Sequence, residues 1–349
     1  MIWFLSAIET EALEQGLTHH IDYPTNNYFD IQEKDINKQI QSISFIDDSL
    51  FPIIGDASQI MEKLKILTKI IHNNSLIFHL KMDYKMGKTQ PMIKFRSKFA
   101  VSEKQQLATQ QNIIKIQYEN TDINLIACSV YKHLGIMTTP DLSLGPELQA
   151  DKKWLHGKIT PNIRNLLKNK EVCLQQSKLL LLTLLASGLI YGTATWSHYT
   201  KSNIDAFHIL VLRAYRLLLP NKFSKNADQQ NLLSDWEVIQ QLELPLPINI
   251  IRIQKFQLLT KLIQKQHSTL LYLLGFSIKT PNSWLQGLTE DIKTLWPIIC
   301  EDEDIVSPSN NIVHWFINNK MTLHKKTIKK NCINGNTQKL SKKRMKKRK

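Results

Sequence analysis

Two adjacent aspartates, Asp47 and Asp48, are the residues of this sequence whose type and spacing point most directly to chemistry. They lie within QSISFIDDSLFPII, residues 41–54, in which apolar residues alternate before the pair and continue after it. This pattern predicts two strands joined by a tight turn, with both carboxylates at the tip of the hairpin and with Ile43 and Phe45 packed against the helix that follows. Because Mg²⁺ prefers oxygen ligands and is commonly held by one or two carboxylates together with substrate phosphates, the pair is a candidate magnesium site. The alternative is an ordinary Asp-Asp turn without a metal, since aspartate is frequent in hairpin turns.

The elements that must position this hairpin are predicted on its C-terminal side. Asp56 followed by Gln59 has the spacing of a helix start, and the helix is expected to end at Asn73-Asn74. Its apolar residues share one face: Ile60, Leu64, Leu67 and Ile71.

Strand-like segments follow this helix, with a turn at Gly87 between the first two. The order of strand, helix, strand and hairpin predicts an α+β domain over residues 1–139. An amphipathic helix is expected before the hairpin, from residue 1 to about residue 15. The segments expected to be strands are 76–82, 91–95, 113–118 and 123–139.

Four short motifs in a fixed order resemble those of a known family. Phe45-Ile46-Asp47-Asp48 is similar to the Tyr/Phe-x-Asp-Asp motif of reverse transcriptases. The segments after it resemble, in the same order, segments of non-LTR, LINE-type retrotransposon polymerases, and the resemblance covers roughly residues 1–270. These segments are Gly87-Lys88-Thr89-Gln90, Tyr131-Lys132-His133-Leu134-Gly135 and GLIYGTATW at 188–196.

The resemblance implies an RNA-directed DNA polymerase, a nucleotidyltransferase that uses Mg²⁺, an RNA template and a DNA primer. It implies that Asp47 is a metal ligand with Asp48 as its neighbour, and that Lys88 steadies the leaving pyrophosphate. Residues 131–135 would grip the primer: Tyr131, Lys132, His133, Leu134 and Gly135. One departure is Asp83, where the family commonly has asparagine, because it brings a carboxylate close to Lys88 in sequence.

A larger departure concerns the first catalytic aspartate, which the family carries on an earlier palm strand behind a fingers region. Met1 lies only about 45 residues before Asp47, so the chain is expected to be a C-terminal fragment that starts inside the palm. Two-metal catalysis needs carboxylates from two strands, and the fragment alone is therefore expected to be inactive. Gln15-Gly16 lacks the Pro-Leu-Ser that follows the family's Gln-Gly, while Asp22 and Asp30 do not lie on strand-like runs.

After Pro140 the sequence becomes helical, and the resemblance implies that this all-helical region, residues 140–300, is a thumb or connector. Residues 179–200 carry no charge, but the dense apolar run stops after about 13 residues and polar residues follow it. A buried core helix is expected there instead of a membrane span. Breaks are expected at Pro161, Pro220, Pro245 and Pro247, between helices at 154–169, 175–191, 203–219, 235–242 and 248–266.

The positive charge of the chain is concentrated at its C-terminus. The formal net charge is +15, yet residues 320–349 hold 13 basic side chains and no acidic one, which leaves about +2 on the rest. Residues 301–349 are expected to form a polar linker, a short aromatic segment and a disordered basic tail. The tail suggests nucleic-acid binding or nuclear import, through Lys342, Lys343, Arg344, Lys346, Lys347 and Arg348.

Two function classes therefore remain: a reverse-transcriptase fragment, and a non-enzymatic nucleic-acid-binding protein that uses the basic tail. Four isolated cysteines without a CxxC spacing argue against a zinc module and against a secreted disulfide scaffold. The N-terminus lacks the basic segment and long apolar run of a signal peptide. A nuclear or cytoplasmic location is expected, without a membrane partner.

Overall fold

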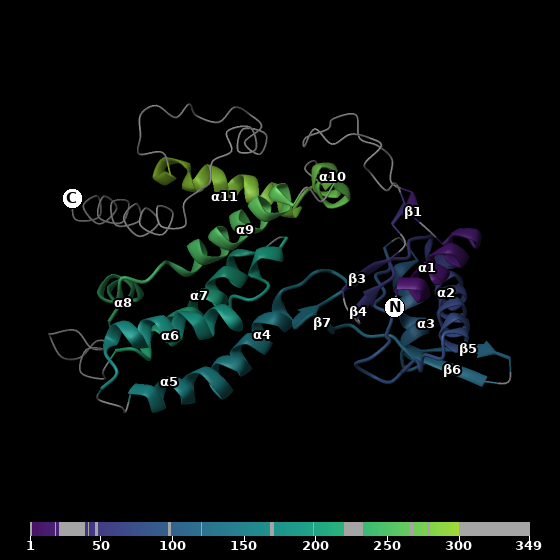
Figure 1. Ribbon diagram of the computed structural model, residues 1–349, viewed down its shortest axis with the longest axis horizontal. Helices are drawn as coiled ribbons and strands as arrows, with labels where there is room; N and C mark the ends of the chain where they lie inside the picture. Colours follow the sequence, from purple (N-terminus) through teal and green to yellow (C-terminus); the bar gives the residue numbers. More distant parts are fainter. Residues whose placement is uncertain are drawn as a thin grey trace. The chain divides into compact units, whose positions relative to one another are not determined.

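The computed structural model has a mixed α+β fold divided into two compact units (Figure 1). It describes residues 2–17, 19–20, 39–40, 42–45, 48–96, 99–119, 121–167, 171–197, 199–219, 233–265, 268–277 and 280–299. The described residues up to Pro146 form unit 1, and those from Glu147 form unit 2. The sequence places the boundary between the two units a little earlier, between residues 139 and 140.

Unit 1 contains three helices and four antiparallel hairpins of two strands each among its described residues. The helices are α1 (Ile2–Glu14), α2 (Ala57–Ile77) and α3 (Ala100–Thr109). The hairpins are β1–β2 (His19–His20, Gln39–Ile40), β3–β4 (Ile43–Phe45, Asp48–Leu50), β5–β6 (Ile113–Tyr118, Thr121–Ile126) and β7–β8 (Tyr131–His133, Ile136–Thr138).

Unit 2 is helical throughout its described part, as the sequence predicts. A continuous run begins with α4 (Gly145–Trp154), passes through the π-helical turn η2 (Leu155–Ile159) and ends with α5 (Thr160–Leu167). The remaining helices are α6 (Leu174–Ser187), the 3₁₀ turn η3 (Thr193–Thr195), α7 (Lys201–Arg216), α8 (Asp235–Leu242), α9 (Pro247–Gln264), α10 (Ser268–Ser277) and α11 (Trp284–Ile299).

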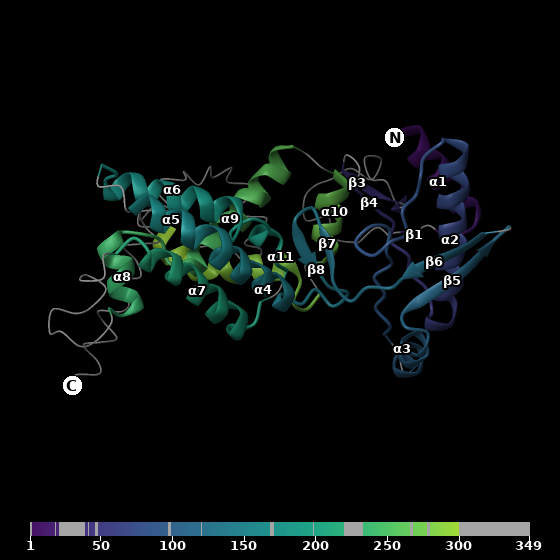
Figure 2. The same cartoon turned by 90° about the horizontal axis from the view of Figure 1, so that it is seen from below.

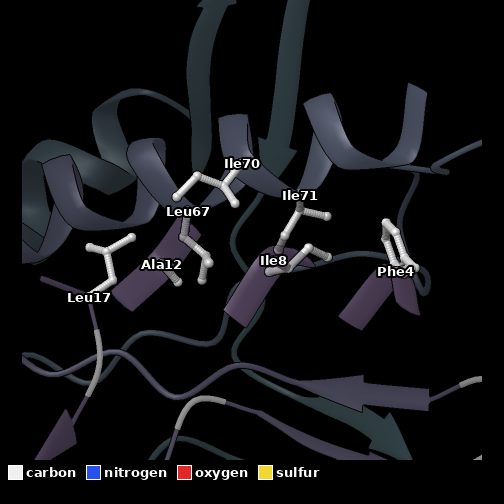
Figure 3. Packing of buried hydrophobic residues seen from close by; sticks show 7 residues of the cluster. All are labelled: Phe4, Ile8, Ala12, Leu17, Leu67, Ile70 and Ile71. Atoms are coloured by element: carbon white, nitrogen blue, oxygen red, sulfur yellow. The ribbon is translucent and has the colours of Figure 1, made fainter. Parts of the chain in front are cut away.

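One apolar core of unit 1 lies between α1 and α2 (Figure 3). Side chains spaced four residues apart on α1 meet the second half of α2, and the two edges of this core are Phe4 and Leu17. Asn74 is buried at this contact and donates hydrogen bonds to Glu11 Oε2 (2.8 Å) and to the carbonyl of Ile70 (2.9 Å). The cluster consists of Phe4, Ile8, Ala12, Leu17, Leu67, Ile70 and Ile71.

The first half of α2 packs on a second core, which the β5–β6 hairpin builds (Figure 2). Alternate residues of the hairpin are buried, and the register pairs Ile114 with Leu125 and Ile116 with Ile123 directly across the strands. Ile60 and Leu64 of α2 pack against this cluster, whereas Leu67 and Ile71 face α1. The single face expected for these four residues is therefore divided between two cores.

Two strands expected from composition are absent from the described residues. Leu76 and Ile77 belong to the last turn of α2, which continues beyond Asn73-Asn74, and residues 80–84 have no strand partner. The side chain of Asn74 bonds back to Ile70 within the helix, so it supports the helix instead of ending it. Residues 91–95 are also extended without being a strand, and α3 was not anticipated.

The hairpin that carries the two aspartates forms as predicted, but its apolar side chains are not packed as predicted. Phe45 pairs with Asp48, and residues 46 and 47 between them lie outside the described residues. Ile43, which was expected to pack against α2, is 55% exposed, and Leu50 is also exposed. Instead Phe51 and Ile53, directly after the hairpin, pack against the α1–α2 core.

In unit 2, the break expected at Pro161 does not occur. Proline lacks the N–H that would bond the preceding turn, and the helix absorbs this loss by widening into the π-helical turn η2 just before it. The carbonyl of Leu155 accepts from the N–H of Thr160, the residue before this proline, and the hydroxyl of Thr160 also donates to it (3.0 Å).

The segment 188–196 connects α6 to the rest of unit 2. Gly188 lies against the indole of Trp154, and a Cβ at this position would overlap that ring. Gly192 has a φ of +83°, which favours glycine, and the indole N–H of Trp284 donates to the carbonyl of Ala194 (2.7 Å). Across the described residues, every helix is too short or too polar to cross a bilayer.

The α1–α2 core makes a direct prediction about stability. Replacing the fully buried Ile8 by alanine should lower the free energy of unfolding of unit 1 by about 2 to 5 kcal/mol, because it leaves a cavity between the two helices. Hydrogen exchange of the α1 and α2 amides measures the change. Leu13→Ala on the exposed side of α1 is the matched control and should change it by about 0.5 kcal/mol or less. Equal effects of the two substitutions would contradict this packing.

Candidate nucleic-acid interface

The β3–β4 hairpin places Asp48 at the first position of β4, opposite Phe45. Asp47 lies outside the described residues, and so does the side chain of Asp48. Within the described part of the chain, no three His, Cys, Asp or Glu residues converge on a point where a metal could bind. The Mg²⁺ site that the resemblance implies at Asp47 and Asp48 therefore stays a prediction.

The loop around Lys88 is held by its own backbone and by Asp83. The carboxylate of Asp83 accepts a hydrogen bond from the N–H of Lys85 (3.0 Å), and its carbonyl accepts one from the N–H of Thr89 (3.0 Å). Gly87 has a φ of +82°, which makes the tight turn possible. Asp83 therefore closes the base of the loop.

Gln90 fastens the loop to the β5–β6 hairpin. Its side-chain oxygen accepts from the N–H of Gly87 (2.6 Å), while its side-chain nitrogen donates to the carbonyl of Ile126 (3.1 Å). The N–H of Cys128 donates to the carbonyl of Pro91 (3.0 Å), directly after Gln90. A carboxamide suits this position because it can accept on one side and donate on the other.

The β7–β8 hairpin confirms the turn that the sequence places near Gly135. His133 pairs with Ile136, and the two connecting residues, Leu134 and Gly135, both have positive φ, as a tight two-residue hairpin turn requires. At the other end of the hairpin, the hydroxyl of Tyr131 donates to the carbonyl of Lys88 (2.8 Å). Two of the sequence motifs, 43 residues apart, are thus in direct contact within unit 1.

This contact leaves the charged groups of both motifs free to meet an anion. It uses the main chain of Lys88, and the side chains of Lys85, Lys88 and Lys132 are exposed. The loop and the hairpin together therefore form an exposed basic structure, which we call the loop–hairpin surface (residues 83–90 and 131–138). Nε2 of His133 is buried and has no hydrogen-bond partner among the described residues, and the expected contact of this residue with a primer stays a prediction.

Two supporting residues were not found from sequence. Tyr84, at the start of the loop, has its hydroxyl 3.0 Å from Nδ1 of His72 on α2, and burial raises the pKa of this phenol to about 12. The ring of His72 also packs edge-on against Tyr118 of β5. These contacts tie the loop to α2 and to the core that the β5–β6 hairpin builds. No sequence signal could reveal them, because a lone histidine on a helix has no partner in its own pattern.

The basic tail residues from Lys342 to Arg348 lie outside the described residues, so their predicted contacts stay predictions. No family model matches this chain, and neither a curated protein nor a solved structure shows significant similarity to it.

The hydrogen bond of Tyr131 predicts the behaviour of the loop in solution. Tyr131→Phe should raise the rate of trypsin cleavage after Lys85 and Lys88 by about two- to tenfold, which corresponds to one lost hydrogen bond of about 0.5 to 1.5 kcal/mol. Tyr118→Phe is the matched control, since it removes a tyrosine hydrogen bond of 3.0 Å to Asn73 elsewhere in the same unit. If both variants are cleaved at the wild-type rate, Tyr131 does not hold the loop.

Proposed function

We propose that this protein is a C-terminal part of a reverse transcriptase of the non-LTR type, and that it binds nucleic acid through the loop–hairpin surface. The observation that carries this proposal is the hydrogen bond between Tyr131 and the main chain of Lys88. In the family that these motifs resemble, the loop contacts the leaving pyrophosphate of the nucleotide and the hairpin grips the primer. Their contact in unit 1 therefore supports a common role in this protein.

The ligand of this surface would be a phosphate backbone. Lysine side chains on a flexible stem bind phosphate as point charges, and such contacts carry no base information. The segment 81–104 holds seven basic and two acidic side chains, so the loop continues into a strongly basic stretch. Lys81, Lys94 and Arg96 are also exposed in this stretch.

Charge removal tests the surface directly. In the triple variant Lys85→Ala, Lys88→Ala, Lys132→Ala, the affinity for a primed RNA–DNA duplex should fall and the slope of log K against log salt should flatten by about 2 to 3, because up to three phosphate contacts are lost. Filter binding across a salt series measures both quantities. The matched control is Lys69→Ala, Lys104→Ala, Lys115→Ala, which removes the same charge from exposed positions on α2, α3 and β5.

The same experiment separates this proposal from the second candidate, nucleic-acid binding by the basic tail. A chain that ends at residue 319 lacks 13 positive charges, and it should lose most of the affinity if the tail dominates. Both triple variants are then measured in the truncated chain. An equal effect of the two triple variants in both backgrounds would remove the loop–hairpin surface from the proposal and leave the tail.

Polymerase activity is a separate question from binding. The sequence contains one Asp-Asp pair, Asp47-Asp48, that resembles the family's motif, so primer extension with Mg²⁺ and deoxynucleoside triphosphates should stay at background. The assay uses the full chain, with Asp47→Ala as the control. Extension that is present in the wild type and lost in Asp47→Ala would show that a second set of carboxylates completes the site.

A further inference from the structure

A buried group of charges lies in unit 2, apart in sequence from the loop–hairpin surface. It consists of Tyr199 before α7, Arg252 and Lys255 on α9, and Asp291 on α11, and we call it the Lys255 cluster. Lys255 is fully buried and Asp291 is 4% exposed. The cluster therefore joins three segments of the unit, and its ammonium group and its carboxylate are both buried.

The carboxylate of Asp291 is already satisfied without Lys255. Its Oδ1 lies 2.9 Å from Nε of Arg252, and the hydroxyl of Tyr199 lies 2.9 Å from Oδ1 and 2.7 Å from Oδ2. Nζ of Lys255 stands 3.7 Å from Oδ2, beyond hydrogen-bond distance, and has no hydrogen-bond partner among the described residues. It faces the ring of Tyr199 instead, 4.4 Å from the ring centre.

The cluster thus contains two cations and one carboxylate, which leaves a surplus positive charge in the core when Lys255 is protonated. Among the described residues, the charged or titratable groups found against Nζ are Asp291, Arg252 and Tyr199, while Gly287 on α11 offers only main chain. Glu290 and Lys293, also on α11, pair with each other at the exposed surface. His198 lies outside the described residues.

Desolvation is the main cause that lowers the pKa of Lys255 to about 8, with a further decrease from Arg252 and a partial opposing effect of Asp291. The phenol of Tyr199 shifts the other way, since burial and Asp291 raise its pKa, so it stays a neutral donor across the relevant range.

We propose that the contact between α9 and α11 responds to pH through this surplus ammonium: the helices are held less firmly while Lys255 carries its proton and more firmly once the amine is neutral. Below about pH 8, Lys255 is protonated in both the folded and the unfolded chain, and the cost of burying it is present in full. Between about pH 8 and 10.5 the unfolded chain binds the proton and the folded chain does not, so stability rises with pH. The contact is therefore weakest at and below neutral pH.

The test is chemical unfolding of the full chain at pH 7 and pH 9, followed by tryptophan fluorescence. Among the tryptophans whose side chains the structure describes, the one in unit 1 is Trp3, which is 80% exposed, so the signal reports unit 2. For the wild type, the unfolding equilibrium constant should fall about tenfold more between pH 7 and pH 9 than for Lys255→Met. Lys255→Met should also be more stable than the wild type at pH 7, since Asp291 keeps Arg252 and Tyr199.

Lys261→Met is the matched control, because Lys261 lies on the same helix with its side chain exposed. It should keep the pH dependence of the wild type. A Lys255→Met protein that is less stable than the wild type at pH 7, or that keeps the full pH dependence, would overturn the proposal, because Lys255 would then be a stabilising partner of Asp291.

A second measurement needs no substitution at Lys255. In wild-type protein labelled with ¹³C at lysine Cε, one resonance should titrate near pH 8, well below the ordinary pKa of lysine of about 10.4. If no lysine resonance titrates near pH 8, the ammonium is not destabilised by its surroundings and the pH-responsive contact does not exist.

Discussion

The helix α2 is the element on which the architecture of unit 1 depends, because it must bury apolar side chains on two sides at once. Its second half packs on α1 and its first half on the β5–β6 hairpin. Neither partner could bury its own apolar residues alone, since a single amphipathic helix and an isolated hairpin are each marginal in water. The loop with Tyr84 and Lys88 starts just beyond the end of α2 and is held to it through His72. The position of the loop–hairpin surface in unit 1 therefore depends on α2.

Buried ionisable groups impose a different constraint on unit 2, and two of them act in opposite directions. On α4, burial and the neighbouring Glu147 raise the pKa of Asp151 to about 8, and its Oδ2 has no hydrogen-bond partner among the described residues. Its folded pKa lies above the unfolded value, so its contribution to stability declines as pH rises from about 4 to 8. The contribution of Lys255 increases only above about pH 8. Near neutral pH the burial of Asp151 and the burial of Lys255 therefore both lower the stability of unit 2. Apolar residues of similar size at these two positions would make the unit more stable.

The parts of the fold that could be predicted from sequence are those set by local patterns. Alternation around Asp47-Asp48 and the Leu134-Gly135 turn predicted two hairpins, and caps and prolines predicted α8 and α9 nearly to the residue. Predictions failed where a distant contact overrides local preference. Residues 76–77 have strand composition but extend α2, whose buried Asn74 bonds to Glu11, 63 residues away. Tyr199 and Asp291 are 92 residues apart, so no local pattern could show that cluster.

The candidate site separates the groups that give it shape from the groups that give it charge. Hydrogen bonds from Tyr131 and Gln90 fix the main chain of the loop, whereas the ammonium groups of Lys85, Lys88 and Lys132 take no part in those bonds. Because shape and charge reside in different atoms, removing the lysine charges should leave the loop intact, and removing the tyrosine hydroxyl should loosen it without changing its charge. Loss of binding can thus be assigned either to electrostatic attraction, which salt screens, or to geometry, which salt does not affect. A polymerase remnant and a simple basic surface differ in this respect, since only the former needs the loop and the hairpin in one fixed arrangement.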